Sequence, residues 1–118
     1  MEVDVAGHGD FAIDVVGVSQ YQDVLEGAAA AGAIVRASIV LEETNPYDDQ
    51  AVAVHIDGRR AGYLSRALAR VYRADLAAGG GDAHLAVRCA AKIVGGFKTP
   101  GGNRAHFGLK LDLPKLSA

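Results

Sequence analysis

The amino-acid sequence predicts a mainly β domain with one or two short helices. Three observations support this fold class: short segments rich in β-branched residues recur along the chain, an Asp-Gly turn signal separates two of them, and one segment has clear helical spacing. The predicted order, β-β-β-β-α-β-β, favours a small, mostly antiparallel barrel or curled sheet. A doubly wound sheet is not expected, because it requires alternating strands and helices. At 118 residues the chain is predicted to form a single domain over 1–118.

The first half of the chain predicts mainly strands. Residues 1–10 are polar and contain glycine, which indicates a loose or edge segment, and the β-branched content of 11–18 favours a strand. Residues 21–32 fit either a short helix or a loop. Residues 33–42 form the clearest strand, because alternate positions are all apolar and predict a core face: Val35, Ala37, Ile39 and Leu41. Pro46 excludes a continuous strand through the polar stretch that follows, 43–50.

The second half predicts a hairpin, a helix and two further strands. Segments 51–56 and 60–64 flank Asp57-Gly58-Arg59, and Asp-Gly between β-prone runs is a strong hairpin signal. Ser65 suits a helix N-cap, and three glycines at 79–81 supply a stop. Between these signals, apolar residues at three- and four-residue spacing predict a buried helix face: Leu64, Leu68, Val71, Tyr72 and Leu76. The last two strands are expected over 84–94 and 106–113, around a loop at 95–105.

The charges divide unevenly between the two halves of the sequence. Residues 1–57 hold 11 acidic residues and one basic residue, a net charge of −10, whereas residues 58–118 hold 3 acidic and 11 basic residues, a net charge of +8. The total of −2 therefore does not exclude a basic surface for nucleic acid. The longest uncharged apolar run, 27–35, is far shorter than the roughly 18–20 residues of a membrane span. Because the N-terminus is acidic where a signal peptide is basic, we expect a cytoplasmic protein with no membrane partner.

Catalytic and metal-binding motifs are weakly represented. The single cysteine, Cys89, provides neither an internal disulfide nor a thiolate zinc cluster, and the histidines lack metal-ligand spacing: His8, His55, His84 and His106. Four carboxylates near the predicted loop match no calcium-loop pattern, so an acidic turn is the simpler interpretation: Glu42, Glu43, Asp48 and Asp49. We therefore expect no enzymatic activity, no bound metal and no cofactor.

Two segments around the predicted helix have features of a binding surface. Asn45-Pro46-Tyr47-Asp48 has the residues of a tight loop, except that a turn does not explain Tyr47. An aromatic residue at a loop tip either folds onto the sheet or contacts a ligand. On the helix, arginines at i, i+4 and i+7 form a basic stripe: Arg66, Arg70 and Arg73. A solvated surface is the usual meaning of such a stripe, although guanidinium groups also match phosphate oxygens.

A third segment, residues 92–104, interleaves basic residues with an aromatic residue among glycines. It contains Phe97 together with Lys92, Lys98 and Arg104. Single-stranded nucleic acid binds to such combinations through backbone charge and base stacking. An ordinary exposed hairpin loop explains the composition equally well.

Several motifs in combination resemble the HIRAN domain family. They are Val15-Val16-Gly17-Val18-Ser19-Gln20-Tyr21, then Leu41 to Asp48 with its Asn-Pro-Tyr-Asp ending and the following Ala51-Val52-Ala53-Val54, and finally Gly62-Tyr63-Leu64-Ser65-Arg66. The resemblance covers about residues 11–76. It implies a small OB-like β-barrel of about six strands, which occurs beside helicase and nuclease domains and also as stand-alone bacterial proteins.

The resemblance also implies a function and roles for individual residues. Characterised members of the family capture the 3′-hydroxyl end of single-stranded DNA during repair and fork remodelling. By position, Tyr47 would stack on the terminal base and Asp48 would accept a hydrogen bond from the terminal hydroxyl. Asn45 would help to hold that pocket, Arg66 would meet a backbone phosphate, and Tyr21 lies in the aromatic segment of the family.

One part of the expected pocket departs from the family pattern. Ser19 and Gln20 stand where end-binding members carry a basic residue and a stacking aromatic residue, so Tyr21 would have to replace that wall. We expect a non-catalytic module that binds single-stranded DNA at its 3′ end through Tyr21, Asn45, Tyr47, Asp48, Arg66, Arg70, Arg73, Phe97, Lys98 and Arg104. A helicase or nuclease is expected as a protein partner. One alternative is a protein–protein interaction module of a DNA-processing complex, with the acidic N-terminal half as its surface. The other is a metal-dependent nuclease that uses the four carboxylates at 42, 43, 48 and 49.

Overall fold

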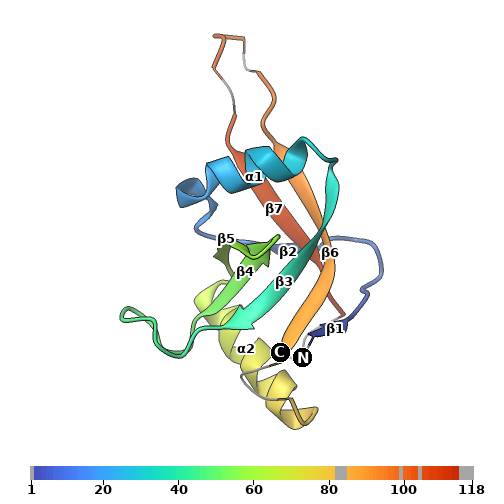
Figure 1. The fold of residues 1–118 in the computed structure, drawn as a ribbon, viewed down its shortest axis with the longest axis vertical. Helices are drawn as coiled ribbons and strands as arrows, with labels where there is room; N and C mark the ends of the chain where they lie inside the picture. Colours follow the sequence, from blue (N-terminus) through green and yellow to red (C-terminus); the bar gives the residue numbers. More distant parts are fainter. Residues whose placement is uncertain (1, 82–84, 99, 104, 115–118) are drawn as a thin grey trace.

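The strands dominate the architecture, as the sequence predicts. The computed structural model describes residues 2–81, 85–98, 100–103 and 105–114 (Figure 1). Within these residues the strands are β1 (Glu2–Asp4), β2 (Ile13–Asp14), β3 (Ile34–Leu41), β4 (Val52–Ile56), β5 (Arg59–Tyr63), β6 (Ala86–Gly95) and β7 (Phe107–Asp112). The helices are the 3-10 helix η1 (Val18–Gln20) and the α-helices α1 (Gln22–Ala29) and α2 (Arg66–Ala78). A mainly β fold with two short α-helices is thereby confirmed.

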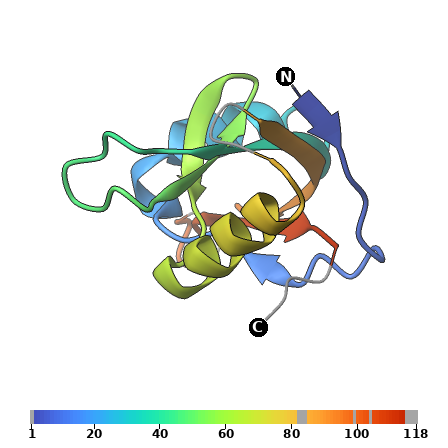
Figure 2. The ribbon, with the colours of Figure 1, turned by 90° about the horizontal axis from the view of Figure 1, so that it is seen from below.

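The strands form one curled sheet in the order β2-β7-β6-β3-β4-β5. Neighbours in this order pair antiparallel, and β1 adds to β6 in the parallel direction. The segment after β2 contacts both ends of the order, because the Val15 N–H donates to the Leu109 carbonyl at 2.9 Å and Val16 forms an isolated bridge with Tyr63. Two hydrogen bonds of 2.8 and 2.9 Å make that bridge. The sheet therefore curls into a small OB-like barrel (Figures 1 and 2).

Gly62 permits the close approach at the point where the barrel closes. A Cβ atom at this position would lie 2.5 Å from Val15 Cγ1 and 2.7 Å from the Val16 carbonyl oxygen. Real Cβ atoms do not tolerate such contacts, and the second contact is with backbone that cannot move aside cheaply. Glycine is therefore required here by space, a common reason for glycine within a strand.

A single apolar cluster fills the barrel, and its central side chains come from four strands and one helix: Leu25, Ile39, Val52, Val54, Cys89, Leu109 and Leu111. The alternation predicted for β3 is present, since Ala37 and Ile39 are buried and Val35 and Leu41 are partly buried against the cluster. The two α-helices lie at opposite ends of the barrel in Figure 1, and α2 crosses the open end seen in Figure 2. Tyr72 and Ala69 of α2 are buried there.

The hairpin and the second helix follow their sequence signals. Asp57 and Gly58 both have positive φ, 51° and 76°, as a two-residue type I′ turn between β4 and β5 requires. Ser65 is the N-cap of α2, with its hydroxyl accepting from the Leu68 N–H at 3.3 Å, and Gly79 is the C-cap. Of the ambiguous stretch 21–32, residues 22–29 are helical as α1.

Two predicted strands differ in extent from those in the structure. The strand expected over 11–18 is limited to Ile13–Asp14. After Asp14 the chain leaves β7, forms the bridge between Val16 and Tyr63, and then turns at Gly17, whose φ is 73°. The strand expected over 84–94 begins at Ala86 and extends to Gly95, and His84 lies outside the described residues. The β6–β7 connection continues as a ladder, with the Ala105 N–H donating to the Phe97 carbonyl at 2.8 Å. It projects as a long arm at the top of Figure 1.

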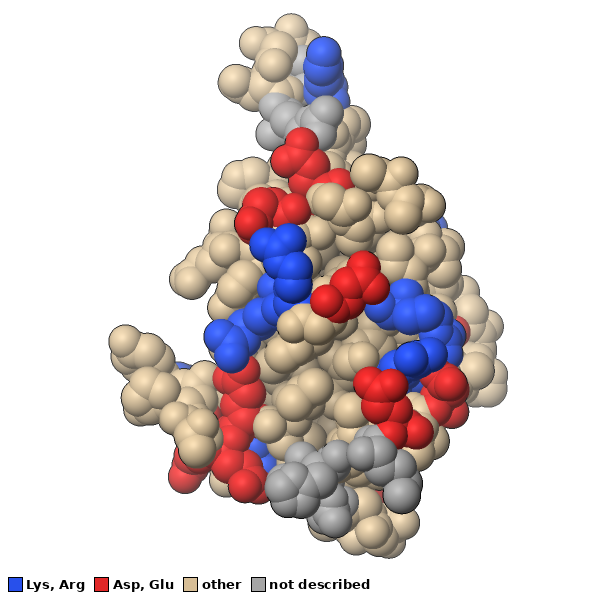
Figure 3. Space-filling view, viewed as in Figure 1, with Lys and Arg blue, Asp and Glu red and all other residues tan. Residues whose placement is uncertain are grey.

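The two oppositely charged halves of the sequence do not become two faces of the protein. Folding pairs bases of the second half with acids of the first half: Arg59–Asp23, Arg60–Glu42, Arg66–Asp48, Arg70–Asp48, Arg88–Glu2, Arg88–Asp4 and Lys110–Asp14. On the face drawn in Figure 3, basic and acidic side chains of the described residues accordingly alternate. Across the described part of the chain, no helix is long and apolar enough to cross a membrane.

Candidate nucleic-acid interface

A groove of about 790 Å³ opens beside the loop that joins β3 to β4. Its walls come from the segment around η1, the end of β3 with the loop, β5, and the first turn of α2. These elements are distant in sequence and meet because the barrel closes at Val16 and Tyr63. The groove brings together five of the predicted site residues: Tyr21, Asn45, Tyr47, Asp48 and Arg66.

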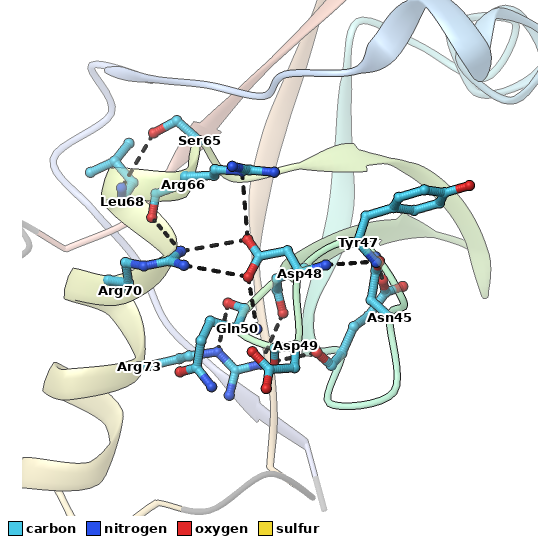
Figure 4. Close-up of polar contacts among 12 residues, drawn as sticks. Asn45, Tyr47, Asp48, Asp49, Gln50, Ser65, Arg66, Leu68, Arg70 and Arg73 are labelled. Carbon is cyan, nitrogen blue, oxygen red and sulfur yellow. Dashed lines mark hydrogen bonds and ion pairs between the residues drawn. The ribbon is translucent and has the colours of Figure 1, made fainter.

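Asn45 shapes the loop from inside. Its Oδ1 accepts from the Tyr47 N–H at 2.9 Å and from the Asp48 N–H at 3.3 Å, which is the Asx-type turn that its position before Pro46 favours. Its Nδ2 donates to Glu42 Oε1 at 3.0 Å and thereby ties the loop to the end of β3. With its amide engaged at both ends, Asn45 holds the backbone that presents Tyr47 (Figure 4).

Tyr47 stands almost free of the protein, with 89 % of its surface exposed. Its ring points away from the arginines of α2 in Figure 4. An exposed tyrosine on a loop whose backbone is fixed by side-chain hydrogen bonds offers a flat apolar surface, and that backbone has little conformational entropy left to lose on binding.

Asp48 points from the same loop towards α2. Its Oδ1 accepts from the Gln50 N–H at 3.0 Å and lies 3.4 Å from Arg70 Nη2, and its Oδ2 lies 3.8 Å from Arg66 Nε (Figure 4). The Gln50 N–H first, and then the two guanidinium groups, lower the pKa of Asp48 below its ordinary value of 3.8. Only 14 % of the side chain is exposed, and it lines the groove. The site therefore contains an ionised carboxylate at neutral pH.

The three arginines of the predicted basic stripe have different roles. Arg66 is exposed and lines the groove. The guanidinium of Arg70 donates to both carboxylate oxygens of Asp48. Arg73 instead turns under the loop and donates to four backbone carbonyls, those of Gln50 at 2.7 Å, Ala51 at 3.0 Å, Glu42 at 3.2 Å and Asp49 at 3.4 Å. The guanidinium of Arg73 is thus used to hold the loop.

A second polar cluster lines the same groove, and it includes a residue that the sequence did not single out. The Arg60 guanidinium lies over the Tyr63 ring at 5.6 Å from its centroid and pairs with Glu42 Oε2. Tyr21 lines the groove together with Arg60 and Tyr63. Burial, and then the neighbouring Glu42 carboxylate, raise the pKa of Tyr63 to about 12, so its hydroxyl stays protonated.

A β-bulge explains why alternation along the sequence does not reveal this cluster. Between β4 and β5 the register shifts, since Val54 opposes Gly62 whereas His55 opposes Arg60. Ala61 is the additional residue on β5. In a regular strand residues i and i+3 lie on opposite faces, and the bulge breaks this alternation. Arg60 and Tyr63 consequently come together in the groove.

The remaining predicted site residues lie elsewhere. Phe97 and Lys98 are exposed on the β6–β7 arm, Phe97 by 65 %, and the arm projects away from the β3–β4 loop in Figure 1. Neither residue lines the groove. Arg104 lies outside the described residues. The structure therefore does not bring the arm and the groove into one site.

The acidic residues of the loop are dispersed among different partners. Glu42 bonds Arg60 and Asn45, whereas Asp48 bonds Arg70 and the backbone. In the part of the chain that the structure describes, no three His, Cys, Asp or Glu side chains are grouped so that they could hold a metal ion. Cys89 is buried in the core, and burial raises the pKa of its thiol to about 11.

Comparison of the chain with protein-family models, curated proteins and solved structures found no match. The function is therefore argued from the groove. Its walls carry two kinds of flat surface, an exposed tyrosine and an arginine over a tyrosine, and its floor carries a carboxylate beside an exposed guanidinium.

Proposed function

We propose that this protein is a non-catalytic module that binds the 3′-hydroxyl end of single-stranded DNA in the groove. The observation that carries the proposal is the convergence of an exposed aromatic ring, Tyr47, an ionised carboxylate, Asp48, and an exposed cation, Arg66, in one groove of about 790 Å³. These groups match a base, a free hydroxyl and a phosphate in turn. The resemblance to the HIRAN family supports the same assignment.

Stacking on Tyr47 supplies affinity that does not depend on sequence. Base–aromatic stacking contributes roughly 1–3 kcal/mol per base, and every base has a face to stack. The loop backbone that carries the ring is already held by the Asn45 hydrogen bonds, so the ordering needed on binding is confined to the Tyr47 side chain. Tyr47 is therefore the residue whose removal lowers affinity for all sequences alike.

Asp48 supplies the preference for the end. An ionised carboxylate has about four lone-pair sites and accepts only, so it can take a bond from a terminal hydroxyl in addition to its bond from Gln50 and its two long contacts with Arg70. A terminal phosphate has no donor for Asp48 at neutral pH and adds negative charge next to it, which disfavours that end. Arg66, 3.8 Å from Asp48 and largely exposed, is free to turn towards the phosphate that precedes the terminal nucleoside.

The test is a pair of substitutions that make the same charge change at neighbouring positions. Asp48→Asn removes the carboxylate in the groove, whereas Asp49→Asn removes an exposed one that does not line it. Fluorescence anisotropy with 3′-hydroxyl and 3′-phosphate oligonucleotides should show a preference for the hydroxyl that Asp48→Asn reduces and Asp49→Asn retains. Equal reduction by both substitutions would assign the preference to net charge and would contradict the role of Asp48.

The salt dependence of the same titration gives the number of phosphates contacted. For single strands the slope of log K against log salt is about −0.7 per neutralised phosphate. Since the groove contains one largely exposed arginine and one that is already paired with Glu42, we expect a slope between about −0.7 and −1.5. A much steeper slope would indicate an extended basic interface outside the groove.

The biological setting follows from the resemblance alone. We propose that end capture in the cytoplasm serves DNA repair or replication-fork processing, beside a helicase or nuclease partner. The fate of 3′ ends tests this setting, because a bound module should protect a 3′-hydroxyl strand from a 3′-to-5′ exonuclease. Protection of 3′-phosphate strands to the same degree would oppose end-selective capture.

A further inference from the structure

We infer that Arg60, held over Tyr63, is a second base-stacking surface, so that the groove takes two consecutive nucleotides of the strand and not the terminal one alone. This inference rests on the proposed function and adds the length of the bound segment. Tyr47 and Arg60 come from different elements, the β3–β4 loop and β5, and both line the groove.

The Arg60 guanidinium is fixed before any ligand arrives. It lies 5.6 Å from the centroid of the Tyr63 ring and pairs with Glu42 Oε2. Glu42 is itself bonded to Asn45, so the two walls of the groove share one hydrogen-bonded network. Such fixation lowers the ordering cost of stacking, as a rigid aromatic residue does.

Charge favours stacking over phosphate binding at this position. The carboxylate of Glu42 stands next to the guanidinium and neutralises it, and a phosphate brought to Arg60 would meet that carboxylate too. The Nη2 group of Arg60 already donates to Glu42. The planar surface remains, with 43 % of the side chain exposed, and guanidinium planes stack on unpaired bases.

The dimensions of the groove agree with more than one bound nucleoside. A volume of about 790 Å³ lies in the upper part of the roughly 300–1,000 Å³ range of sites that enclose a drug-sized ligand. Gln20 and Tyr21 also line the groove. Arg60 over Tyr63 therefore provides a flat surface on a wall where Gln20 offers none.

The test combines abasic oligonucleotides with a substitution that separates planarity from charge. Arg60→Lys keeps the positive charge beside Glu42 and loses the planar guanidinium. Arg59→Lys is the matched control, because Arg59 is the neighbouring arginine, is paired with Asp23, and does not line the groove. Anisotropy is measured for short 3′-hydroxyl strands with one abasic nucleotide at the terminal, the penultimate or the third position.

For the wild-type protein we expect affinity to fall roughly five- to 100-fold for an abasic site at either of the last two positions, and little at the third. Arg60→Lys should weaken the intact strand about fivefold or more and abolish the sensitivity at the penultimate position, with the terminal sensitivity kept. Tyr47→Ala should do the reverse, and Arg59→Lys should match the wild-type protein.

The outcomes separate this inference from the function on which it rests. If strands bind with a 3′-hydroxyl preference but only the terminal base matters, or if Arg60→Lys leaves the pattern unchanged, the second stacking surface is wrong and end capture stands. If no strand binds at low salt, the proposed function fails and the second surface fails with it.

Discussion

Arg73 provides a sharp test of how the candidate site is built, because it lies one turn from Arg70 on the same helix and has a different role. Arg73 donates to four carbonyls of the β3–β4 loop and its flanks, whereas Arg70 makes two long contacts of 3.4 and 3.5 Å with Asp48. Arg73→Gln and Arg70→Gln remove the same charge from the same helix. We predict that only the first substantially destabilises the protein.

The magnitude follows from the acceptors that Arg73 bonds. Two of its four bonds, to the Glu42 and Ala51 carbonyls, are partly buried, and the other two carbonyls are exposed and become hydrated in the variant. A hydrogen bond to a charged group contributes about 1.5–3 kcal/mol net, and water replaces part of the set. We therefore expect Arg73→Gln to lower the free energy of unfolding by about 1.5–3 kcal/mol, which is roughly 6–12 °C in Tm for a chain of this length.

Thermal and urea unfolding followed by circular dichroism measure this difference. Arg70 is 52 % exposed, and exposed ion pairs contribute little, so Arg70→Gln should lower Tm by less than half as much. Hydrogen exchange should show faster exchange of the Tyr47 and Asp48 amides in Arg73→Gln. An Arg70→Gln variant that loses as much stability as Arg73→Gln, or an Arg73→Gln variant with wild-type stability, would refute the reasoning.

Three further predictions concern barrel closure, the core thiol and pH. Gly62→Ala places a Cβ against the backbone where the barrel closes and should lower the free energy of unfolding by about 1–3 kcal/mol. Gly27→Ala, in open space on α1, should be neutral or raise it by up to about 1 kcal/mol. Equal Tm values for the two variants would argue against this closure of the barrel. Cys89, buried and with its pKa raised to about 11, should react with a disulfide reagent at pH 8 only after unfolding, and rapid labelling of the native protein would contradict its place in the core. The pKa of Asp48 is lowered on folding, so its contribution to stability and to the hydroxyl preference is present above the unfolded value and is lost as pH falls through the folded value. Titrations with the 3′-hydroxyl strand, whose terminal group does not titrate in this range, should therefore give a constant affinity above about pH 5, and an affinity that declines between pH 8 and pH 6 would assign the effect to another group.

Local signals predict much of this fold because their causes are local. Asp57-Gly58 predicts its turn because both residues tolerate positive φ, and Ser65 predicts the start of α2 because its hydroxyl caps a nearby amide. The alternation along β3 predicts its buried face because successive side chains of a strand point to opposite faces of the sheet. The segment at 22–29 stays ambiguous in the sequence, because its small residues give weak periodicity and its burial depends on the barrel end that it covers.

The candidate site was only partly predictable, because its decisive contacts join residues far apart in sequence. The role of Arg73 depends on backbone carbonyls more than twenty residues away, which no side-chain pattern encodes. Arg60 reaches the groove through a bulge at Ala61 that breaks the strand alternation. The division of charge along the chain does not say where the charges lie after folding, and the folded chain pairs the halves with each other, as Asp48 and Arg70 illustrate.

The central claim is that the groove selects a free 3′-hydroxyl end, and one titration tests it most directly. The wild-type protein is titrated by fluorescence anisotropy into the same single strand carrying a 3′-hydroxyl or a 3′-phosphate, with a blunt duplex of that sequence as the third ligand. The account predicts that the 3′-hydroxyl strand binds at least about tenfold more tightly than the other two, a difference of about 1.4 kcal/mol. Equal affinity for hydroxyl and phosphate ends would contradict it.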